Sequence, residues 1–356
     1  MATSLAAFGW HLAFPIVPPR HEQLSATGYK ASSWRLAVNQ LHHPTMRLLI
    51  RVGLAGILTG CASAPAPSVP PGAQAISFLG DTLRQLPLAA ATRERYERQL
   101  AEARAAYDRA PTDADSIVWL GRRLAYLGRI REAIDVYTRG VALHPENPWL
   151  YRHRGHRYIS VRELDRAIAD LERATRLVAG TPDQVEPDGQ PNAQNTPIGT
   201  LQSNIAYHLG LAYYLKGNYA GAVDVYRGEL ADARNDDRRV STAHWLYMSL
   251  RRLGRDAEAA EVLVPFRSQM NVIENETYHH LLLMYKGEMP ADSVLPVTAT
   301  GEMSVTDATA AYGIGNWHLY NGRRAEAEQI FRRILAGGQW GAFGYIAAEK
   351  ELAGMR

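Results

Sequence analysis

Apolar and small residues recur with a period of 34 in the stretch from Ala114 to Thr181, where two blocks follow each other in one register. Within a block the apolar positions lie three or four residues apart, which is the spacing of one face of an α-helix. Each block also pairs a glycine with an alanine, Gly121 with Ala133 and Gly155 with Ala167. Each block therefore predicts two antiparallel helices that approach closely at their small residues and bury their apolar faces against neighbouring blocks.

The register continues along the chain after an interruption at residues 182–202. Further blocks are predicted to begin at residues 203, 240, 274 and 308, which makes six helix pairs with the two at 114 and 148. The block at 274–307 is degenerate, because Pro290, Pro296 and Gly301 stand where its second helix should lie. Helical spacing in residues 92–110 and 340–355 predicts one capping helix at each end.

The occupied positions are those of the tetratricopeptide-repeat signature. In the first block they are Ile117, Leu120, Gly121, Leu124, Gly128, Ala133, Tyr137, Gly140 and Pro145. The chain resembles tetratricopeptide-repeat proteins from Ala114 to Gly341. The resemblance implies an all-α, right-handed α-solenoid over residues 92–356, with about six helix pairs and two caps. It also implies protein or peptide binding as a class of function, although this fold serves many tasks.

A basic start, an apolar run and a cysteine precede the repeats. Residues 46–60 resemble a bacterial lipoprotein signal peptide, which implies lipidation of Cys61 and anchoring at the periplasmic face of the outer membrane. The apolar run is too short to cross a bilayer. Residues 61–91 are predicted to form a tether rich in alanine and proline. Residues 1–45 are expected to be a misassigned extension before a true start at Met46, or else disordered.

Charge, cysteine content and motifs narrow the possible functions. The formal net charge is +3 over 356 residues and no block of like charge stands out, so a nucleic-acid partner is not expected. Cys61 is the single cysteine, which excludes an intramolecular disulfide. No phosphate-binding loop, nucleophile elbow or HExxH motif occurs in the sequence. We therefore expect no enzyme activity and no cofactor, and the spacing of the histidines does not favour a metal site.

In this family, positions 2, 5, 9, 12 and 13 of each first helix face the concave side, and here they predict an aromatic, mildly basic groove. Such a groove favours an extended peptide or partner protein, acidic or carboxylate-bearing, although tyrosines are also common in these helices for packing alone. The candidate binding residues are Arg122, Tyr126, Trp149, Arg152, His156, Asn204, Tyr207, Tyr214, His244, Met248, Arg251, Tyr278, Tyr285, Tyr312, Asn316 and Tyr320.

Two functions remain open at this point. The first is a lipid-anchored periplasmic scaffold or adaptor that binds a peptide or partner protein in the groove. The second is a solute-binding lipoprotein that uses the aromatic groove for a small ligand or glycan. An open groove would favour the first and deep closure of the superhelix the second. The insertion at residues 182–202 is either a functional or a disordered surface loop.

Overall fold

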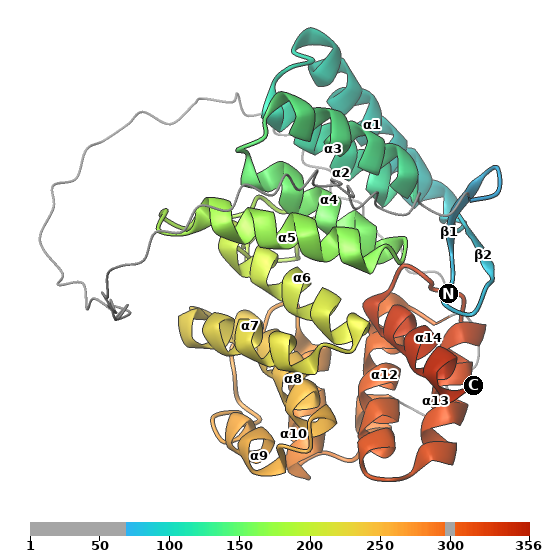
Figure 1. Ribbon diagram of the computed structural model, residues 1–356, viewed down its shortest axis with the longest axis vertical. Helices are drawn as coiled ribbons and strands as arrows, with labels where there is room; N and C mark the ends of the chain where they lie inside the picture. Colours follow the sequence, from blue (N-terminus) through green and yellow to red (C-terminus); the bar gives the residue numbers. More distant parts are fainter. Residues whose placement is uncertain (1–68, 296–302) are drawn as a thin grey trace, which may run out of the picture. The chain divides into compact units, whose positions relative to one another are not determined.

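The computed structural model describes residues 69–295 and 303–356, and these residues form helices apart from one two-stranded hairpin (Figure 1). The signal segment, Cys61 and residues 1–45 lie outside the described residues. The strands are β1 (Ala73–Ile76) and β2 (Thr82–Arg84). The helices are α1 (Ala90–Arg109), α2 (Ala114–Tyr126), α3 (Ile130–Leu143), α4 (Pro148–Ser160), α5 (Leu164–Val178), α6 (Leu201–Lys216), α7 (Tyr219–Asp232), α8 (Asp236–Arg252), α9 (Asp256–Leu263), α10 (Glu276–Lys286), α11 (Ala291–Val294), α12 (Val305–Tyr320), α13 (Arg324–Ala336) and α14 (Phe343–Met355).

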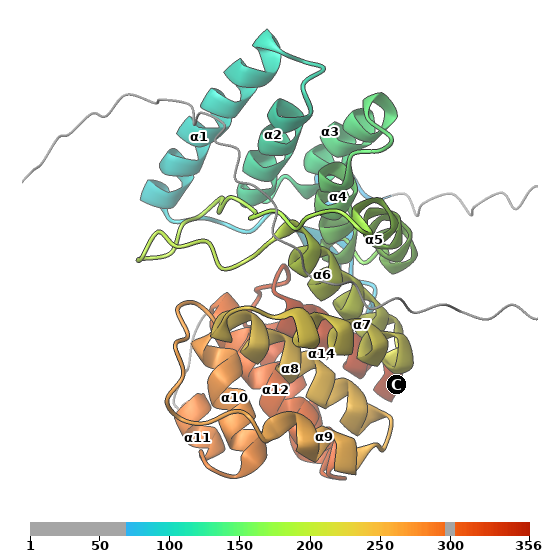
Figure 2. The ribbon, with the colours of Figure 1, turned by 90° about the vertical axis from the view of Figure 1, so that its left-hand side faces the viewer.

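The helices form successive antiparallel pairs, from α2 with α3 to α12 with α13, as the register predicts (Figure 2). The all-α fold is confirmed. Helix α1 packs on α2 before the first pair, and α14 packs on α12 and α13 after the last. The fifth pair is irregular, because α11 has only four residues. Helix α8 begins at Asp236, four residues before the predicted start of its block, with Asn235 capping its first turn.

The small residues of the signature allow the two helices of a pair to touch. A Cβ atom added at Gly121 would lie 2.3 Å from the ring of Tyr137, and one at Gly155 would lie 2.7 Å from Leu171. Ala133 and Ala167 on the facing helices are fully buried. The close approach inferred from the sequence is therefore what the structure shows.

The turn between the two helices of a pair uses a residue with positive φ. Glycine occupies it in five pairs, as at Gly128 with φ 76°. The second pair has Arg162 there instead, with φ 66°. A side chain in this left-handed region costs about 1–2 kcal/mol. The structure accounts for the arginine through its tertiary contacts.

Arg162 reaches the far end of the chain and pairs with Glu349 of α14. Its Nη2 lies 2.6 Å from Glu349 Oε2, and its Nη1 donates to the carbonyl oxygen of Ser160 at 2.6 Å. Both side chains are buried, at 3% and 0% exposure. The backbone N–H of Phe78 donates to the same carboxylate. This Arg162–Glu349 clasp joins the second helix pair, the hairpin and the C-terminal helix.

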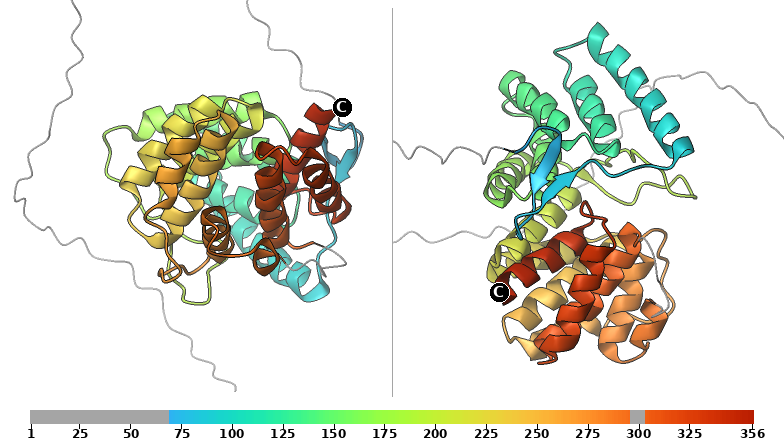
Figure 3. Two further views of the ribbon diagram at one scale, coloured as in Figure 1. Left: turned by 90° about the horizontal axis from the view of Figure 1, so that it is seen from below. Right: turned by 90° about the vertical axis from the view of Figure 1, so that its right-hand side faces the viewer.

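The hairpin corrects one prediction, because residues 73–84 are not part of a tether. Gln74 accepts hydrogen bonds from Arg131 at the start of α3, and Trp340 Nε1 donates to the carbonyl oxygen of Arg84 at 2.7 Å. Ala73, Ala75 and Leu83 are buried. The hairpin thus bridges the first pair and the C-terminal cap (Figure 3). Its strands are too short for their alternation to stand out in an alanine-rich stretch.

The last pairs fold back on the middle of the chain. Helix α12 contacts α8, and α14 contacts α6, although these helices are far apart in sequence. Figure 1 shows α14 beside the end of α6. The concave side is therefore partly filled by the chain's own C-terminal helices. Among the described helices, none combines the length and the apolar character needed to cross a membrane.

Candidate binding cleft

A cleft of about 500 Å³ remains on the concave side. Its walls come from the first helices α2, α4, α6, α8, α10 and α12, together with the insertion loop (residues 182–200) and the start of α14. A volume of this size is typical of ligand sites in proteins. Six of the sixteen candidate residues line it, namely Arg122, Tyr126, Arg152, Asn204, Tyr207 and Tyr278.

The insertion loop lies across this concave face. Glu186 is only 5% exposed, and its carboxylate lies 2.9 Å from Arg152 Nε and accepts a hydrogen bond from Asn204 Nδ2 at 2.9 Å. Arg123 of α2 donates to the carbonyl oxygen of Gly189 at 2.8 Å. At its other side Asn192 donates to Glu274. The loop therefore occupies part of the predicted groove with an irregular backbone, and it is a structural part of the cleft.

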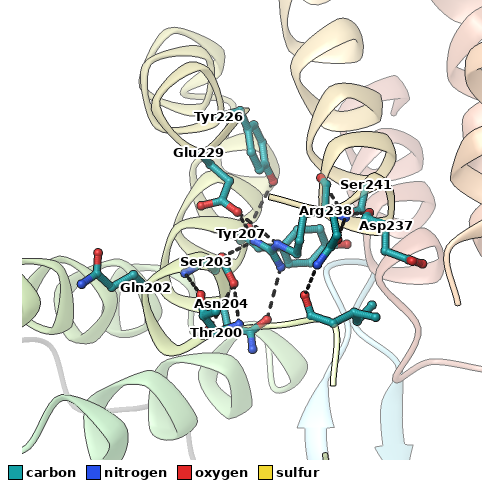
Figure 4. A network of polar contacts seen from close by, with 12 residues as sticks. Thr200, Gln202, Ser203, Asn204, Tyr207, Tyr226, Glu229, Asp237, Arg238 and Ser241 are labelled. Carbon is teal, nitrogen blue, oxygen red and sulfur yellow. Dashed lines mark hydrogen bonds and ion pairs between the residues drawn. The ribbon is translucent and has the colours of Figure 1, made fainter. Parts of the chain in front are cut away.

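Arg238 of α8 anchors the floor of the cleft (Figure 4). It donates to the carbonyl oxygen of Ser203 at 2.6 Å and to Asn204 Oδ1 at 3.4 Å, and it forms a buried ion pair with Glu229. Burial raises the pKa of Glu229 above its usual range, and Arg238 opposes that shift. These contacts pair the charge of Arg238 and hold α6, α7 and α8 together.

The aromatic wall of the cleft is fixed by hydrogen bonds. The hydroxyl groups of Tyr207 and Tyr278 lie 2.7 Å apart, and Trp245 Nε1 donates to Tyr207 at 3.1 Å. Burial raises the pKa of Tyr207 well above its usual value, so that it remains a neutral phenol. The ring of Phe343 lies 6.3 Å from that of Tyr207. Rigid aromatic walls of this kind offer contact area at little cost in side-chain entropy.

Three histidines lie together behind the loop. The ring centroids of His156 and His208 are 4.2 Å apart, and His208 Nδ1 lies 2.6 Å from the carbonyl oxygen of Asn204. Since a carbonyl oxygen can only accept, Nδ1 carries the proton. Burial lowers the pKa of His153, His156 and His208 well below the usual value, and neighbouring arginines lower each of them further. All three rings are therefore neutral at neutral pH.

Six candidate residues do not line a groove, and the prediction is wrong for them. They are buried: Tyr214, His244, Met248, Tyr285, Tyr312 and Asn316. The Tyr214 and Tyr312 hydroxyl groups lie 2.7 Å apart, and Asn316 Nδ2 donates to Tyr214 at 2.9 Å. The physical reason is the closure of the last pairs, which turns these concave residues of α6, α8, α10 and α12 into core.

The four remaining candidates lie near the cleft or beyond it. His156 lines a smaller cavity beside it. Trp149 is half-buried and packs against the apolar cluster of α5 and α6. Arg251 lies over the ring of Tyr320 at 4.4 Å, and its Nε is 2.7 Å from Asp256 Oδ1. Neither Trp149, Arg251 nor Tyr320 is among the residues that line the cleft.

The cleft also contains residues that were not predicted. Position 2 of the first helix lines it in four consecutive pairs: Asn204 was a candidate, whereas Ser241, Asn275 and Thr309 were not. The register pointed to this position, but its small polar residues attracted less attention than the tyrosines. The acidic loop residues Glu186 and Asp188 had no signal in the sequence, because they lie outside the repeat.

Comparison with known proteins finds likeness only among solved structures. No family model and no curated protein matches the sequence. Among solved structures the chain is similar to YrrB, described as a TPR protein with an unusual peptide-binding site, at 15% identity over 66% of this chain and 91% of that one, with a TM-score of 0.38. It is similar to a tetratricopeptide-repeat protein from Parabacteroides merdae at 14% identity, over 74% and 100% of the two chains, with a TM-score of 0.41.

MamA shows a similar level of likeness, at 20% identity over 48% of this chain and 88% of that one, with a TM-score of 0.37. TM-scores this low do not establish the fold, so the assignment of the fold rests on the chain's own geometry. Helix pairs recur with the signature period, their small residues meet as the signature requires, and glycine occupies most of the turns between them. Residues 114–336 therefore have the fold of tetratricopeptide-repeat proteins.

Proposed function

We propose that the protein is a binding module whose concave cleft holds a short extended segment of a partner protein. One observation carries this proposal: the same face already holds a segment of its own chain that belongs to no helix. The loop is bound through its backbone at Gly189 and through its side chain at Glu186. A surface that binds both the backbone and a side chain of one polypeptide segment can bind the same groups of a second segment.

The cleft beside the loop offers such a partner mixed chemistry. Arg122 and Arg152 face Glu186, Asp188 and Glu274, while Tyr207, Tyr278 and Phe343 supply apolar area. Glu186 pairs with Arg152, and Asp188 and Glu274 add further negative charge to the lining, so the cleft as a whole is less basic than the sequence predicted. We therefore propose a partner segment of mixed polarity, and we propose no catalytic role for these residues.

The role of the cleft in binding is tested by filling it with a large side chain. Thr277, in the first turn of α10, lines the cleft, and Thr277→Trp is expected to abolish capture of partners from solubilised membranes by residues 62–356. Thr175→Trp on the exposed face of α5 is the matched control and should leave capture unchanged. Equal loss with both variants, or no loss with Thr277→Trp, would contradict the cleft as the binding site.

A second candidate is supported by the closure of the concave side. Because α14 packs on α6 and the cleft measures about 500 Å³, a small ligand or glycan would also fit. Native mass spectrometry of the purified protein distinguishes the two functions. A bound small molecule that is present in the wild type and in Thr175→Trp, but absent from Thr277→Trp, would favour the solute-binding function.

We also propose that the protein is lipid-anchored at the periplasmic face of the outer membrane, on the basis of the sequence before the repeats. The wild-type protein is expected in the membrane fraction and labelled by palmitate, because several acyl chains anchor a protein stably. Cys61→Ser is expected to be unprocessed or soluble. Wild-type protein in the soluble fraction without label would contradict the anchor.

A further inference from the structure

A smaller cavity of about 100 Å³ adjoins the cleft, between α2, α3, α4 and the insertion loop. It shares Arg122 and Arg152 with the cleft, and Arg157 of α4 completes a set of three arginines in its wall. We call this cavity the arginine pocket. Glu186 is the one carboxylate that lines it, so two of the three guanidinium charges have no counterpart in the wall.

The contacts of the three arginines show how little of this charge is paired. Arg152 lies beside Glu186. Arg122 stacks on Trp119 at 4.5 Å and donates a long hydrogen bond of 3.4 Å to Tyr126. Within residues 69–295 and 303–356, neither Arg122 nor Arg157 forms an ion pair with a carboxylate. Burial raises the pKa of Asp188 and Arg122 opposes that shift, but Asp188 lines the cleft and not the arginine pocket.

The cations persist at neutral pH in spite of burial. Burial lowers the pKa of Arg157 to about 10, which still leaves its guanidinium protonated at pH 7. The neighbouring His153 and His156 are neutral, since burial and the arginines lower their pKa values. Arg122 is 9% exposed and Arg157 is half-buried, and holding an unpaired charge away from water costs free energy.

Polar atoms around the pocket are also left without partners. Among the described residues, His153 Nε2 and Arg152 Nε are buried and have no hydrogen-bond partner of suitable geometry, although Arg152 lies within ion-pair distance of Glu186. Arg152 is 6% exposed and His153 is 5% exposed. Guanidinium groups present N–H pairs whose spacing fits the oxygens of a carboxylate or phosphate. The pocket therefore presents donors and positive charge that suit a small anion with several acceptor oxygens.

We propose that the arginine pocket binds one small oxyanion, of phosphate or carboxylate chemistry, between Arg122, Arg152 and Arg157. The anion is either free in solution or carried by the segment that occupies the cleft. In the second case the inference rests on the proposed function, and it restricts the expected acidic character of the partner to a single group.

The free anion is tested with inorganic phosphate and no partner. Phosphate is expected to raise the melting temperature of the wild type above that in chloride at equal ionic strength, because it binds only the folded state. Arg157→Gln is expected to weaken phosphate binding about tenfold or more in calorimetry, since it removes charge-assisted hydrogen bonds. Arg157→Lys should recover part of the affinity, and Arg176→Gln, on the exposed face of α5, should match the wild type.

The melting temperature without phosphate distinguishes loss of phosphate binding from loss of folding. Without phosphate, Arg157→Gln should melt no lower than the wild type, because it removes a cation that lacks an anionic partner. The second source is tested with a short peptide that has a free C-terminal carboxylate and with its amide. If the peptide acid competes with phosphate and the peptide amide does not, the anionic group belongs to a partner.

The inference is overturned if neither phosphate nor the peptide acid raises the melting temperature of the wild type above that in chloride. It is also overturned if Arg157→Gln binds phosphate as tightly as the wild type. Because phosphate is titrated without any partner, the arginine pocket and the cleft can fail independently. Loss of capture in Thr277→Trp with unchanged phosphate binding would support the cleft, and the reverse pattern would support the pocket alone.

Discussion

Replacing Glu349 with alanine is expected to lower the free energy of unfolding by about 3–5 kcal/mol, the effect of removing one partner from a buried ion pair. The substitution leaves the guanidinium of Arg162 buried without its carboxylate. It also removes the acceptor of the Phe78 backbone N–H. Urea denaturation followed by circular dichroism measures the change through the shift in midpoint.

An exposed ion pair supplies the control. Glu328 pairs with Arg332 at the surface, where side-chain exposures are 36% and 69%, so Glu328→Ala should cost about 0–1 kcal/mol. The double variant Arg162→Met with Glu349→Leu should recover most of the lost stability, because no charge then remains buried. If Glu349→Ala costs no more than Glu328→Ala, the clasp does not hold the C-terminal helix.

Adding one methyl group at Gly344 is expected to lower the free energy of unfolding by about 1–3 kcal/mol, the usual cost of overpacking, or more. A Cβ atom there would lie 2.2 Å from the carbonyl oxygen of Ala308 and 2.9 Å from Thr309 Cα. Both contacts are with backbone, which cannot rotate away. Helix α14 would have to move off α12, and thermal denaturation of Gly344→Ala measures the cost.

Gly354 in the same helix is the matched control, because a Cβ atom there meets nothing within 4 Å. Gly354→Ala should be neutral or stabilising by up to about 1 kcal/mol, since alanine favours the helix. Equal melting temperatures for the two variants would show that α14 does not pack closely on α12. Since Phe343 and Thr309 line the cleft, Gly344→Ala should also weaken partner capture.

These two contacts explain why closure was not predicted. In the sequence, Arg162 stands at a turn where glycine is usual, and Glu349 is one of several charges in the predicted C-terminal capping helix. Their meeting depends on the curvature accumulated over five helix pairs, which no local spacing encodes. The left-handed backbone at Arg162 is tolerated because its side chain contributes the clasp.

The residues of the candidate site also divide into those that the repeat register predicts and those that depend on contacts far apart in the sequence. Asn204, Tyr207 and Tyr278 follow from the register, because a first helix presents the same positions wherever it stands in the array. His244 and Met248 occupy equivalent positions but are buried by α12 and its neighbours. Glu186 lies outside the repeat, so its approach to Arg152 depended on the path of a loop with no periodic signal.

Local sequence patterns specify the helix pairs, their boundaries to within a few residues, the irregular fifth pair and the small residues at which the helices meet. Those features depend on contacts within about one repeat, so the period of apolar and small residues is enough to specify them. The tertiary structure alone decided that the hairpin is part of the fold, that the superhelix closes and that the insertion loop enters the concave face. Each of these depends on groups far apart in the chain, whose burial and charge are matched only when the whole array has folded.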